Sequence, residues 1–347
     1  MLYYKTKSMK AAADLAAMLA DGKEAFVIWA KESIRLDFDR AGNATGRGQG
    51  KPHFDAVEVW PSMSAKEITA AHRLAAGRRT CREKEEAAAA ILDRLPDISA
   101  ADRLALLDLV NVAYHGSGKI EGCFSVDGCA SCDFCRKMIS AGACNPLVIC
   151  RYCYADRDSY KEFSWRRHTL NARILSTVLF TAGELARLAI DGQRCRFNED
   201  GDTVNETHAR NLLRISYTRP GTMFGYWYKN HVAVEAGLHA EGFHTRDQLP
   251  KNVRFIHSSV LIGFRVNRTW FDDATFTVYP DAETTAAAIA GGSWACNGKR
   301  CRACGYWCYT HERRPEPIDI AELLRCKDTE RAAILDAYRA RLARLAA

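Results

Sequence analysis

The chain has 347 residues, of which 48% are hydrophobic and 26% are charged, with 23 glycines and 9 prolines. This composition is that of an ordinary globular protein and excludes collagen-like, low-complexity and wholly disordered chains. The length allows two domains, or one α/β domain with appendages. The longest apolar stretches are well short of the roughly 18 residues that span a bilayer, and the first residues lack the pattern of a secretory signal. We therefore expect a cytoplasmic protein without a membrane partner.

The number of cysteines is unusual for such a protein. The chain contains 14 of them, and the reducing cytoplasm makes disulfides rare, so metal binding is the first interpretation. The net charge of +7, from 49 Lys and Arg against 42 Asp and Glu, gives a mild positive field. That field favours an anionic partner, nucleic acid included, without requiring one.

Residues 1–118 are expected to be a mostly helical accessory region. Residues 8–22 fit a helix, and Ser64 and Thr80 each begin a capping-box pattern, in which a hydroxyl and a carboxylate three residues apart bind free backbone amides. Another helix is expected to start near Ser99 and to end around residue 116. Residues 24–29 are β-rich and predict a strand, and the glycine-rich residues 42–51 predict a loop.

After the cysteine-rich residues 120–155, strand-like and helix-like segments alternate. Helices are expected from Ser159, over 181–191 and over 205–217, and strands over 194–198, 224–228, 253–257 and 275–279. Such alternation indicates an α/β fold with a mainly parallel sheet. Helices are expected from residue 318 to the end. We accordingly expect a cysteine-rich α/β domain over 119–312 and C-terminal helices over 313–347.

The cysteines form two groups in the sequence. Gaps of two residues, as in Cys129-x2-Cys132-x2-Cys135, Cys150-x2-Cys153 and Cys301-x2-Cys304, let neighbouring thiolates turn onto one metal ion or cluster. The other three cysteines, Cys81, Cys195 and Cys326, are expected to be small core residues. The first group is Cys123, Cys129, Cys132, Cys135, Cys144, Cys150 and Cys153, and the second is Cys296, Cys301, Cys304 and Cys308.

The spacing leaves two metals open. Paired Cys-x2-Cys hooks suit tetrahedral zinc, whereas three closely spaced cysteines with a distant fourth suit an iron-sulfur cluster. The first group is more typical of iron-sulfur binding. Neither group has the pair, spacer, pair layout of a zinc ribbon, so iron-sulfur is the main prediction and zinc is the alternative.

Several short motifs follow one another between residues 118 and 312. They are Gly118-Lys119-Ile120, Asp133-Phe134-Cys135-Arg136-Lys137-Met138, Ile149-Cys150-Arg151-Tyr152-Cys153-Tyr154-Ala155, Arg196-Phe197-Asn198-Glu199-Asp200-Gly201-Asp202, Tyr226-Trp227-Tyr228-Lys229-Asn230, Pro250-Lys251-Asn252 and Cys296-Asn297-Gly298-Lys299-Arg300-Cys301-Arg302-Ala303-Cys304. In this order the chain resembles the phage gene product 88 family, whose members occur in phages, plasmids and other mobile elements.

That resemblance implies an iron-sulfur protein distantly similar to radical S-adenosylmethionine enzymes, with two [4Fe-4S] clusters. It also makes a partial (β/α) barrel an alternative to an open sheet. The three-cysteine loop of that superfamily corresponds to Cys144-x5-Cys150-x2-Cys153, whose first gap is two residues longer than usual. Cys129, Cys132 and Cys135 are an alternative set. The expected metal ligands are Cys132, Cys135, Cys144, Cys150, Cys153, Cys296, Cys301, Cys304 and Cys308.

The resemblance also points to a cofactor-binding strand end. In these enzymes an acidic, glycine-containing strand end binds the amino group of S-adenosylmethionine, and the segment Asn198, Glu199, Asp200, Gly201 and Asp202 follows an expected strand. Asp200 and Asp202 are the candidates to receive that ammonium. His208, on the helix that follows, is a further candidate, although a simple polar turn and a solvated helix face explain the same residues.

Three hypotheses remain open from the sequence. The first is a radical S-adenosylmethionine-like enzyme with an unknown substrate and a reducing partner such as a flavodoxin or ferredoxin. The second is a zinc-stabilised nucleic-acid-binding protein, and the third is a non-catalytic iron-sulfur sensor or interaction protein. The second predicts a colourless protein whose nucleic-acid affinity falls steeply with salt.

Overall fold

The computed structural model divides the chain into two compact units, Met1–Ala89 and Ala90–Ala347. The residues that the structure describes are 2–6, 25–29, 35–38, 44–48, 57–59, 80–115, 121–128, 145–152, 162–199, 201–296, 301, 307–309, 312–324, 326 and 328–346.

The described part of residues 1–79 consists of strands. In chain order they are β1 (Leu2–Thr6), β2 (Ala25–Trp29), β3 (Arg35–Phe38), β4 (Ala44–Gly48) and β5 (Val57–Val59). β2, β1 and β5 form a parallel sheet, and β3 pairs with β4 in antiparallel fashion.

Two of our expectations for this region can be compared with the strands. The expected strand over 24–29 is confirmed by β2, whereas β4 occupies part of the segment that we expected to be a loop. The helices expected over 8–22 and after Ser64 lie outside the described residues. A helix covers residues 80–92, as Thr80 predicted.

The second unit alternates strands and helices. Its elements are α3 (Ala100–Leu109), β6 (Ala113–His115), β7 (Cys123–Val126), η1 (Ile149–Tyr152), α6 (Glu162–Thr177), α7 (Ala182–Leu185), β8 (Arg194–Phe197), α8 (Glu206–Tyr217), β9 (Met223–Tyr228), α9 (His231–Ala240), η3 (Arg246–Gln248), β10 (Val253–Ser258), β11 (Ala274–Tyr279), α10 (Ala282–Ala290), β12 (Trp294–Ala295), η5 (Trp307–Tyr309), β13 (Ile318–Leu323) and α11 (Asp328–Ala346).

One eight-stranded sheet organises this unit. The strand order is β12-β13-β11-β10-β9-β8-β7-β6, and every described pairing is parallel except that of β6 with β7. The predicted α/β fold with a mainly parallel sheet is therefore confirmed. From β7 to β11 each strand lies beside the one that precedes it in the chain, so the sheet grows in one direction.

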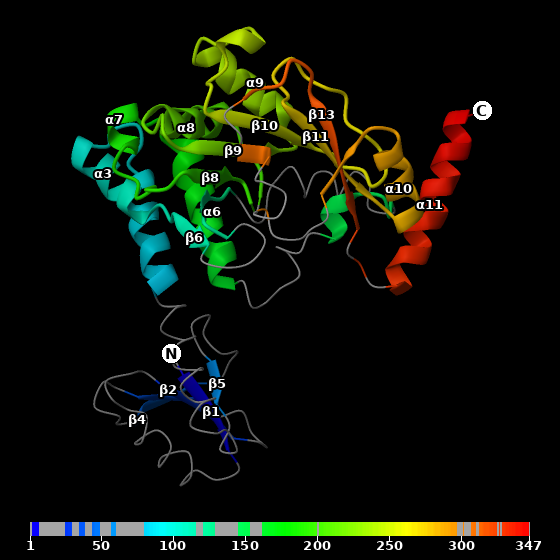
Figure 1. Ribbon diagram of the computed structural model, residues 1–347. Helices are drawn as coiled ribbons and strands as arrows, with labels where there is room; N and C mark the ends of the chain where they lie inside the picture. The colour runs from blue at the N-terminus through cyan, green and yellow to red at the C-terminus, as the bar shows by residue number, and fades with distance from the viewer. Residues whose placement is uncertain are drawn as a thin grey trace. The chain divides into compact units, whose positions relative to one another are not determined.

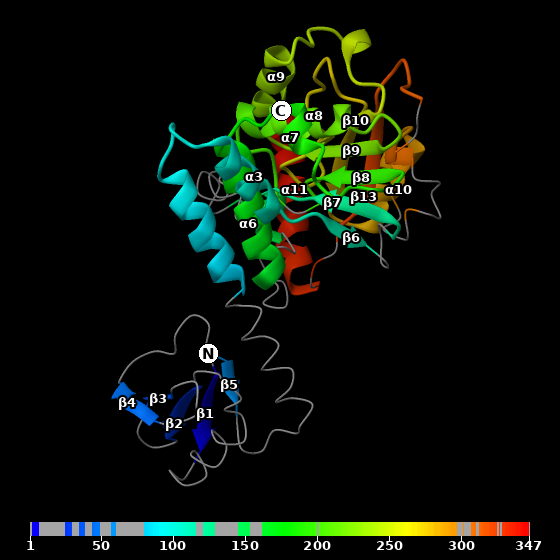
Figure 2. The same ribbon diagram turned by 90° about the vertical axis from the view of Figure 1, so that its left-hand side faces the viewer.

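The helices lie along this sheet and at its two ends (Figure 1). α8 and α9 cover one side of the central strands, α3, α6 and α7 lie at the β6–β8 end, and α10 and α11 lie at the β11–β13 end. Figure 2 shows β10, β9, β8, β7 and β6 following one another along the sheet. None of the helices in the described ranges is long and apolar enough to cross a membrane.

Alternating side chains of the central strands build the core. Phe197, Phe224, Tyr226 and Phe255 are fully buried. The Phe197 and Phe224 rings stack with centroids 4.9 Å apart, and the Tyr226 ring lies 5.6 Å from that of Phe255. Burying one such ring contributes about 1.5–3 kcal/mol, so this aromatic layer holds β8, β9 and β10 in place.

Polar side chains fix α8 against its neighbours. Asn205 caps the helix by accepting a hydrogen bond from the His208 backbone N–H, with N···O 3.0 Å. Asn211 is fully buried, accepts from the Phe180 N–H and donates to the carbonyl oxygens of Leu175 and Val178. These bonds tie the end of α6 to α8, which gives Asn211 a structural role.

One expected element has the wrong type. We expected helices from residue 318 onwards, but Ile318–Leu323 form β13, which pairs with β11 and β12 inside the sheet. Ile318 and Ile320 face the same side of that strand, as the two-residue period of a strand requires. A helix, α11, begins only at Asp328.

Candidate metal and cofactor site

The structure describes part of the cysteine-rich sequence. Cys150 lies in η1, and Cys296, Cys301 and Cys308 of the second group are described. The other expected ligands lie outside the described residues, namely Cys132, Cys135, Cys144, Cys153 and Cys304, together with Cys129 of the alternative set.

Cys301 and Cys308 pack against one side of the sheet. They contact a buried cluster of Cys123, Met223 and Tyr309, in which Cys123 and Met223 are the first residues of β7 and β9. By sequence Cys123 belongs to the first cysteine group. The sheet therefore brings a cysteine of the first group beside two cysteines of the second.

Gly225 makes room for this packing. A Cβ atom at this position would lie 3.1 Å from Tyr309 Cε1 and 3.4 Å from the Cys308 carbonyl oxygen. On the neighbouring strands, Cys296 and Cys308 pack against an apolar cluster from β10, β11 and β13. The described cysteines of the second group thus share one side of the sheet.

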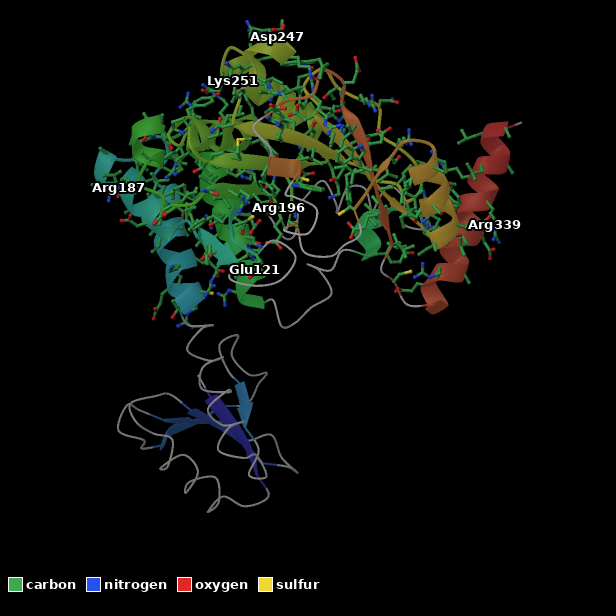
Figure 3. The ribbon with its side chains drawn as sticks, in the orientation of Figure 1. Glu121, Arg187, Arg196, Asp247, Lys251 and Arg339 are labelled. Carbon is green, nitrogen blue, oxygen red and sulfur yellow. The ribbon has the colours of Figure 1, made fainter. Side chains whose placement is uncertain are left out.

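Two arginines of β8, Arg194 and Arg196, lie near these cysteines. Burial raises the pKa of the Cys123 thiol, and Arg194 on β8 opposes that effect. The Arg196 guanidinium carbon lies 4.4 Å from the centre of the Trp227 ring. Figure 3 shows Arg196 on the side of the sheet opposite α8 and α9. The effect of burial is larger than that of Arg194, so the Cys123 thiol stays neutral at pH 7 in the absence of a metal.

Thiols beside guanidinium groups are a donor set that fits a metal centre held by cysteines. A second observation supports the fit, because Arg254 on β10 is 1% exposed and two of its nitrogens, Nε and Nη2, have no hydrogen-bond partner among the described residues. Thiolate-bound metal centres are anionic, so they suit such a cation. Within the described ranges, however, no three Cys, His, Asp or Glu side chains converge closely enough to hold a metal ion.

The carboxyl ends of β7 and β8 form a second polar region. Asp127 and Gly128 directly follow β7, and the Asp127 Oδ1 accepts a hydrogen bond from the Glu199 backbone N–H, with N···O 2.6 Å. A Cβ atom at Gly128 would lie 2.6 Å from both Asn198 Oδ1 and the Asp202 carbonyl oxygen. The residues just before the first cysteine loop are therefore joined to the strand end over 198–202.

Asn198 turns the chain at the end of β8. Its φ of 58° lies in the left-handed region, which Asn adopts more readily than most residues. Its Nδ2 donates to the Trp227 carbonyl oxygen at 2.9 Å and to Thr203 Oγ1 at 3.2 Å. Its Oδ1 is buried and has no hydrogen-bond partner in the part of the chain that the structure describes. With Gly201 at φ 91°, the segment folds back towards β9.

The Asp202 carboxylate accepts hydrogen bonds from backbone N–H groups. It accepts hydrogen bonds from the N–H groups of Thr203 at 2.7 Å, Lys229 at 3.1 Å and Asn230 at 3.0 Å. It is 1% exposed, and burial raises its pKa while the Lys229 charge opposes that rise. Asp202 therefore joins the ends of β8 and β9, and its oxygens are already engaged by amides. Asp200 lies outside the described residues.

A chain of polar contacts crosses the same region. Glu199 Oε2 lies 3.0 Å from His115 Nε2, which lies 2.9 Å from Ser125 Oγ. Ser125 donates to Asp127 Oδ2 at 2.7 Å, and His168 Nε2 lies 3.4 Å from that oxygen. The hydrogen bond with Glu199 raises the pKa of His115. These groups can hold a proton or pass it between carboxylates and imidazoles.

His208 has a local structural contact. It is fully buried, and its Nδ1 accepts a hydrogen bond from the Val204 N–H at 3.2 Å. Burial lowers its pKa to about 4, so the ring is neutral at pH 7. Nδ1 acts as an acceptor, so the ring proton is on Nε2, which has no described partner.

Sequence reasoning missed three residues of these regions. Asp127 and His115 gave no signal because their partners lie 72 and 10 residues away in the chain. Arg254 was hidden within a strand-like segment. A charged residue in the middle of an otherwise apolar strand was the available signal, since unpaired charges are rarely buried.

A comparison of the chain with protein-family models, with curated proteins and with solved structures found no match in any of the three.

Proposed function

We propose that this chain is an iron-sulfur enzyme of the phage gene product 88 type, similar to radical S-adenosylmethionine enzymes and acting in the cytoplasm on a substrate still to be identified. The observation that carries the proposal is the junction of Asp127 and Gly128 with the strand end over 198–202. It brings the residues that immediately precede the closely spaced cysteines in the sequence next to a polar, glycine-containing strand end. Those are the two parts that the resemblance assigns to a cluster and its nucleotide.

The order of the strands supports this proposal. Parallel crossovers are almost always right-handed, so a sheet that grows in one direction carries its helices on one side and leaves the other side for ligands. Six parallel strands follow one another here, β7, β8, β9, β10, β11 and β13. We interpret them as a partial (β/α) barrel. In such folds ligands bind at the carboxyl ends of the strands.

The proposal assigns roles to this chain's own residues. Cys144, Cys150 and Cys153, or in the alternative Cys129, Cys132 and Cys135, would bind one [4Fe-4S] cluster through three of its irons and leave the fourth open. When bound, the cluster supplies the electron that cleaves a carbon-sulfur bond of S-adenosylmethionine. A reducing partner such as a flavodoxin or ferredoxin would donate that electron.

Around this cluster, the polar residues orient the site. Asn198 and Asp202 fix the shape of the strand end through their bonds to the β9 end. Glu199 and His115 hold a proton at the His115 Nε2, because their hydrogen bond favours the imidazolium. The second cysteine group, on the side of the sheet near the amino ends of β7 and β9, would hold the other [4Fe-4S] cluster.

Paired cysteine variants test the assignment of two clusters. Cys150→Ser with Cys153→Ser, and separately Cys301→Ser with Cys304→Ser, are each expected to lose about four irons per chain after anaerobic purification. S-adenosylmethionine should still perturb the electron paramagnetic resonance signal in the second pair and not in the first. Cys195→Ala, which changes a buried cysteine outside both groups, is the control and should keep all iron.

Three results would contradict the proposal. Iron that stays at the wild-type level in both pairs would mean that these cysteines are not ligands. Tight zinc with no iron would favour the zinc-stabilised nucleic-acid-binding alternative, and iron without any response to the nucleotide would favour a sensor or interaction protein.

A further inference from the structure

A row of residues crosses the sheet on the side of the second cysteine group. Strand pairing places Arg196 of β8 beside Gly225 of β9, and Gly225 beside Arg254 of β10. Neighbouring strands lie about 4.8 Å apart, so two arginines flank the glycine against which Cys308 and Tyr309 pack. We refer to Arg196, Gly225 and Arg254 as the arginine row.

Arg254 is the member of the row with unused donors. It is 1% exposed, and its Nη1 donates to the carbonyl oxygens of Lys251 and Val253, both at 2.9 Å. Its Nε and Nη2 have no hydrogen-bond partner among the described residues. Burial lowers its pKa to about 10, yet the group stays charged at pH 7. Burying a charge costs free energy unless the charge is paired, so a bound anion would stabilise the Arg254 guanidinium.

The described acidic residue near Arg254 is already shared. Asp273 Oδ1 lies 3.1 Å from Arg246 Nη2 and 2.8 Å from Arg313 Nε. Asp273 Oδ2 also accepts the Phe255 N–H at 2.9 Å. Asp273 thus pairs with Arg246 and Arg313, and it acts on Arg254 only through its charge, while those two arginines repel Arg254. One carboxylate therefore faces three guanidinium groups.

We propose that the arginine row is the counter-charge of a metal centre held by the second cysteine group, and that Arg254 raises the reduction potential of that centre. Four thiolates make an iron-sulfur cluster anionic, and reduction adds a further negative charge. A fixed cation therefore stabilises the reduced state more than the oxidised state. The inference rests on the proposed function only for iron at the second group, and it does not depend on S-adenosylmethionine.

Redox titration of the anaerobically purified protein tests this inference. Arg254→Met is expected to lower the equilibrium constant for reducing the second cluster roughly tenfold, which is about 59 mV for one electron. Arg254→Lys keeps the charge and should shift the potential less. Arg214→Met is the control, because Arg214 lies on α8 and pairs with Glu241 at 2.8 Å. It should leave the potential unchanged.

If Arg254→Met binds too little iron for a redox titration, the melting temperature tests the same inference. In a Cys301→Ser/Cys308→Ser background the centre is absent, so Arg254→Met removes a buried unpaired charge and should raise the melting temperature. In the iron-loaded wild-type background the same change should lower the melting temperature. This reversal of sign would not arise if Arg254 had only a packing role.

The outcomes separate this inference from the proposed function. An unchanged potential in folded, iron-loaded Arg254→Met overturns the inference, and so does the absence of the sign reversal. Iron bound only by the first cysteine group also overturns it, while the proposed radical chemistry stands. Zinc at the second group that Arg254→Met releases more easily supports the counter-charge and contradicts the iron-sulfur function.

Discussion

Replacing Gly128 with alanine tests the contact between the end of β7 and the strand end over 198–202. The new Cβ atom would lie 2.6 Å from Asn198 Oδ1 and 2.6 Å from the Asp202 carbonyl oxygen. Real Cβ atoms do not approach oxygens this closely. The Asn198 side chain can turn away, but the Asp202 carbonyl is backbone, so the two strand ends must separate.

The size of the effect follows from this geometry. Overpacking a buried site costs about 1–3 kcal/mol, and a backbone contact places Gly128→Ala near 3 kcal/mol, or about 6–12 °C in melting temperature for a unit of this size. We also expect weaker binding of S-adenosylmethionine, because the Asp127 bond to the Glu199 N–H would lengthen. Thermal unfolding by circular dichroism and calorimetric titration of the nucleotide, both without oxygen, measure the two effects.

Gly183→Ala is the matched control. Gly183 lies in α7, and an added Cβ would have no atom within 4 Å. Alanine favours the helix by up to about 1 kcal/mol, so this variant should be slightly more stable and should bind the nucleotide normally. If Gly128→Ala matched the wild type in both assays, the two strand ends would not be packed as described and our reasoning about the site would be wrong.

Two further predictions concern pH. The Arg103 hydrogen bonds lower the pKa of Glu184 to about 2, so this carboxylate stabilises the fold above pH 4.5 and loses that effect as the pH falls towards 2. Glu184→Gln should cost about 2 kcal/mol of unfolding free energy at pH 7 and less at pH 3, and equal losses at both pH values would contradict this. The Glu199 bond raises the pKa of His115, so the pair stabilises the fold below pH 6.5 and loses that effect as the pH rises through the raised pKa. Glu199→Gln should cost about 1 kcal/mol at pH 5.5 and little at pH 9, and it should lower the pKa of His115 in an NMR titration, whereas an unmoved pKa would show that the pair does not form.

Local sequence patterns were sufficient to predict the central strands and α8. β9 is rich in aromatic residues, β10 and β11 combine β-branched and aromatic residues, and Asn205 marks the start of α8. Such signals are local, so the sequence carries them. The parallel sheet followed from their alternation with helices.

β13 was mispredicted because its signal is weak and its partners are distant. Ile318 pairs with Ala274, 44 residues earlier in the chain. The surrounding Leu, Glu and Ala residues favour a helix locally. Pairing with β11 inside the sheet overrides that propensity, and no local pattern reports such a pairing.

The candidate site was predicted in part. The strand-like pattern over 194–198 predicted that Asn198 and Asp202 lie at a strand end. It did not predict that the Asp202 carboxylate accepts hydrogen bonds from the backbone after β9. Its amide donors at Lys229 and Asn230 are 27 and 28 residues away. The same limit explains Cys123, because the sheet places it beside Cys301 and Cys308 while its sequence neighbours belong to the other group. Contacts across strands depend on register, which the sequence of a single strand does not fix.

The most direct test of the proposed function is electron paramagnetic resonance of the reduced, anaerobically purified protein with and without S-adenosylmethionine, combined with iron and sulfide analysis. We predict about eight irons per chain and a signal that the nucleotide perturbs, because one cluster would bind it through an open iron position. Zinc without iron, or iron whose signal does not respond to the nucleotide, would contradict a radical S-adenosylmethionine-like enzyme.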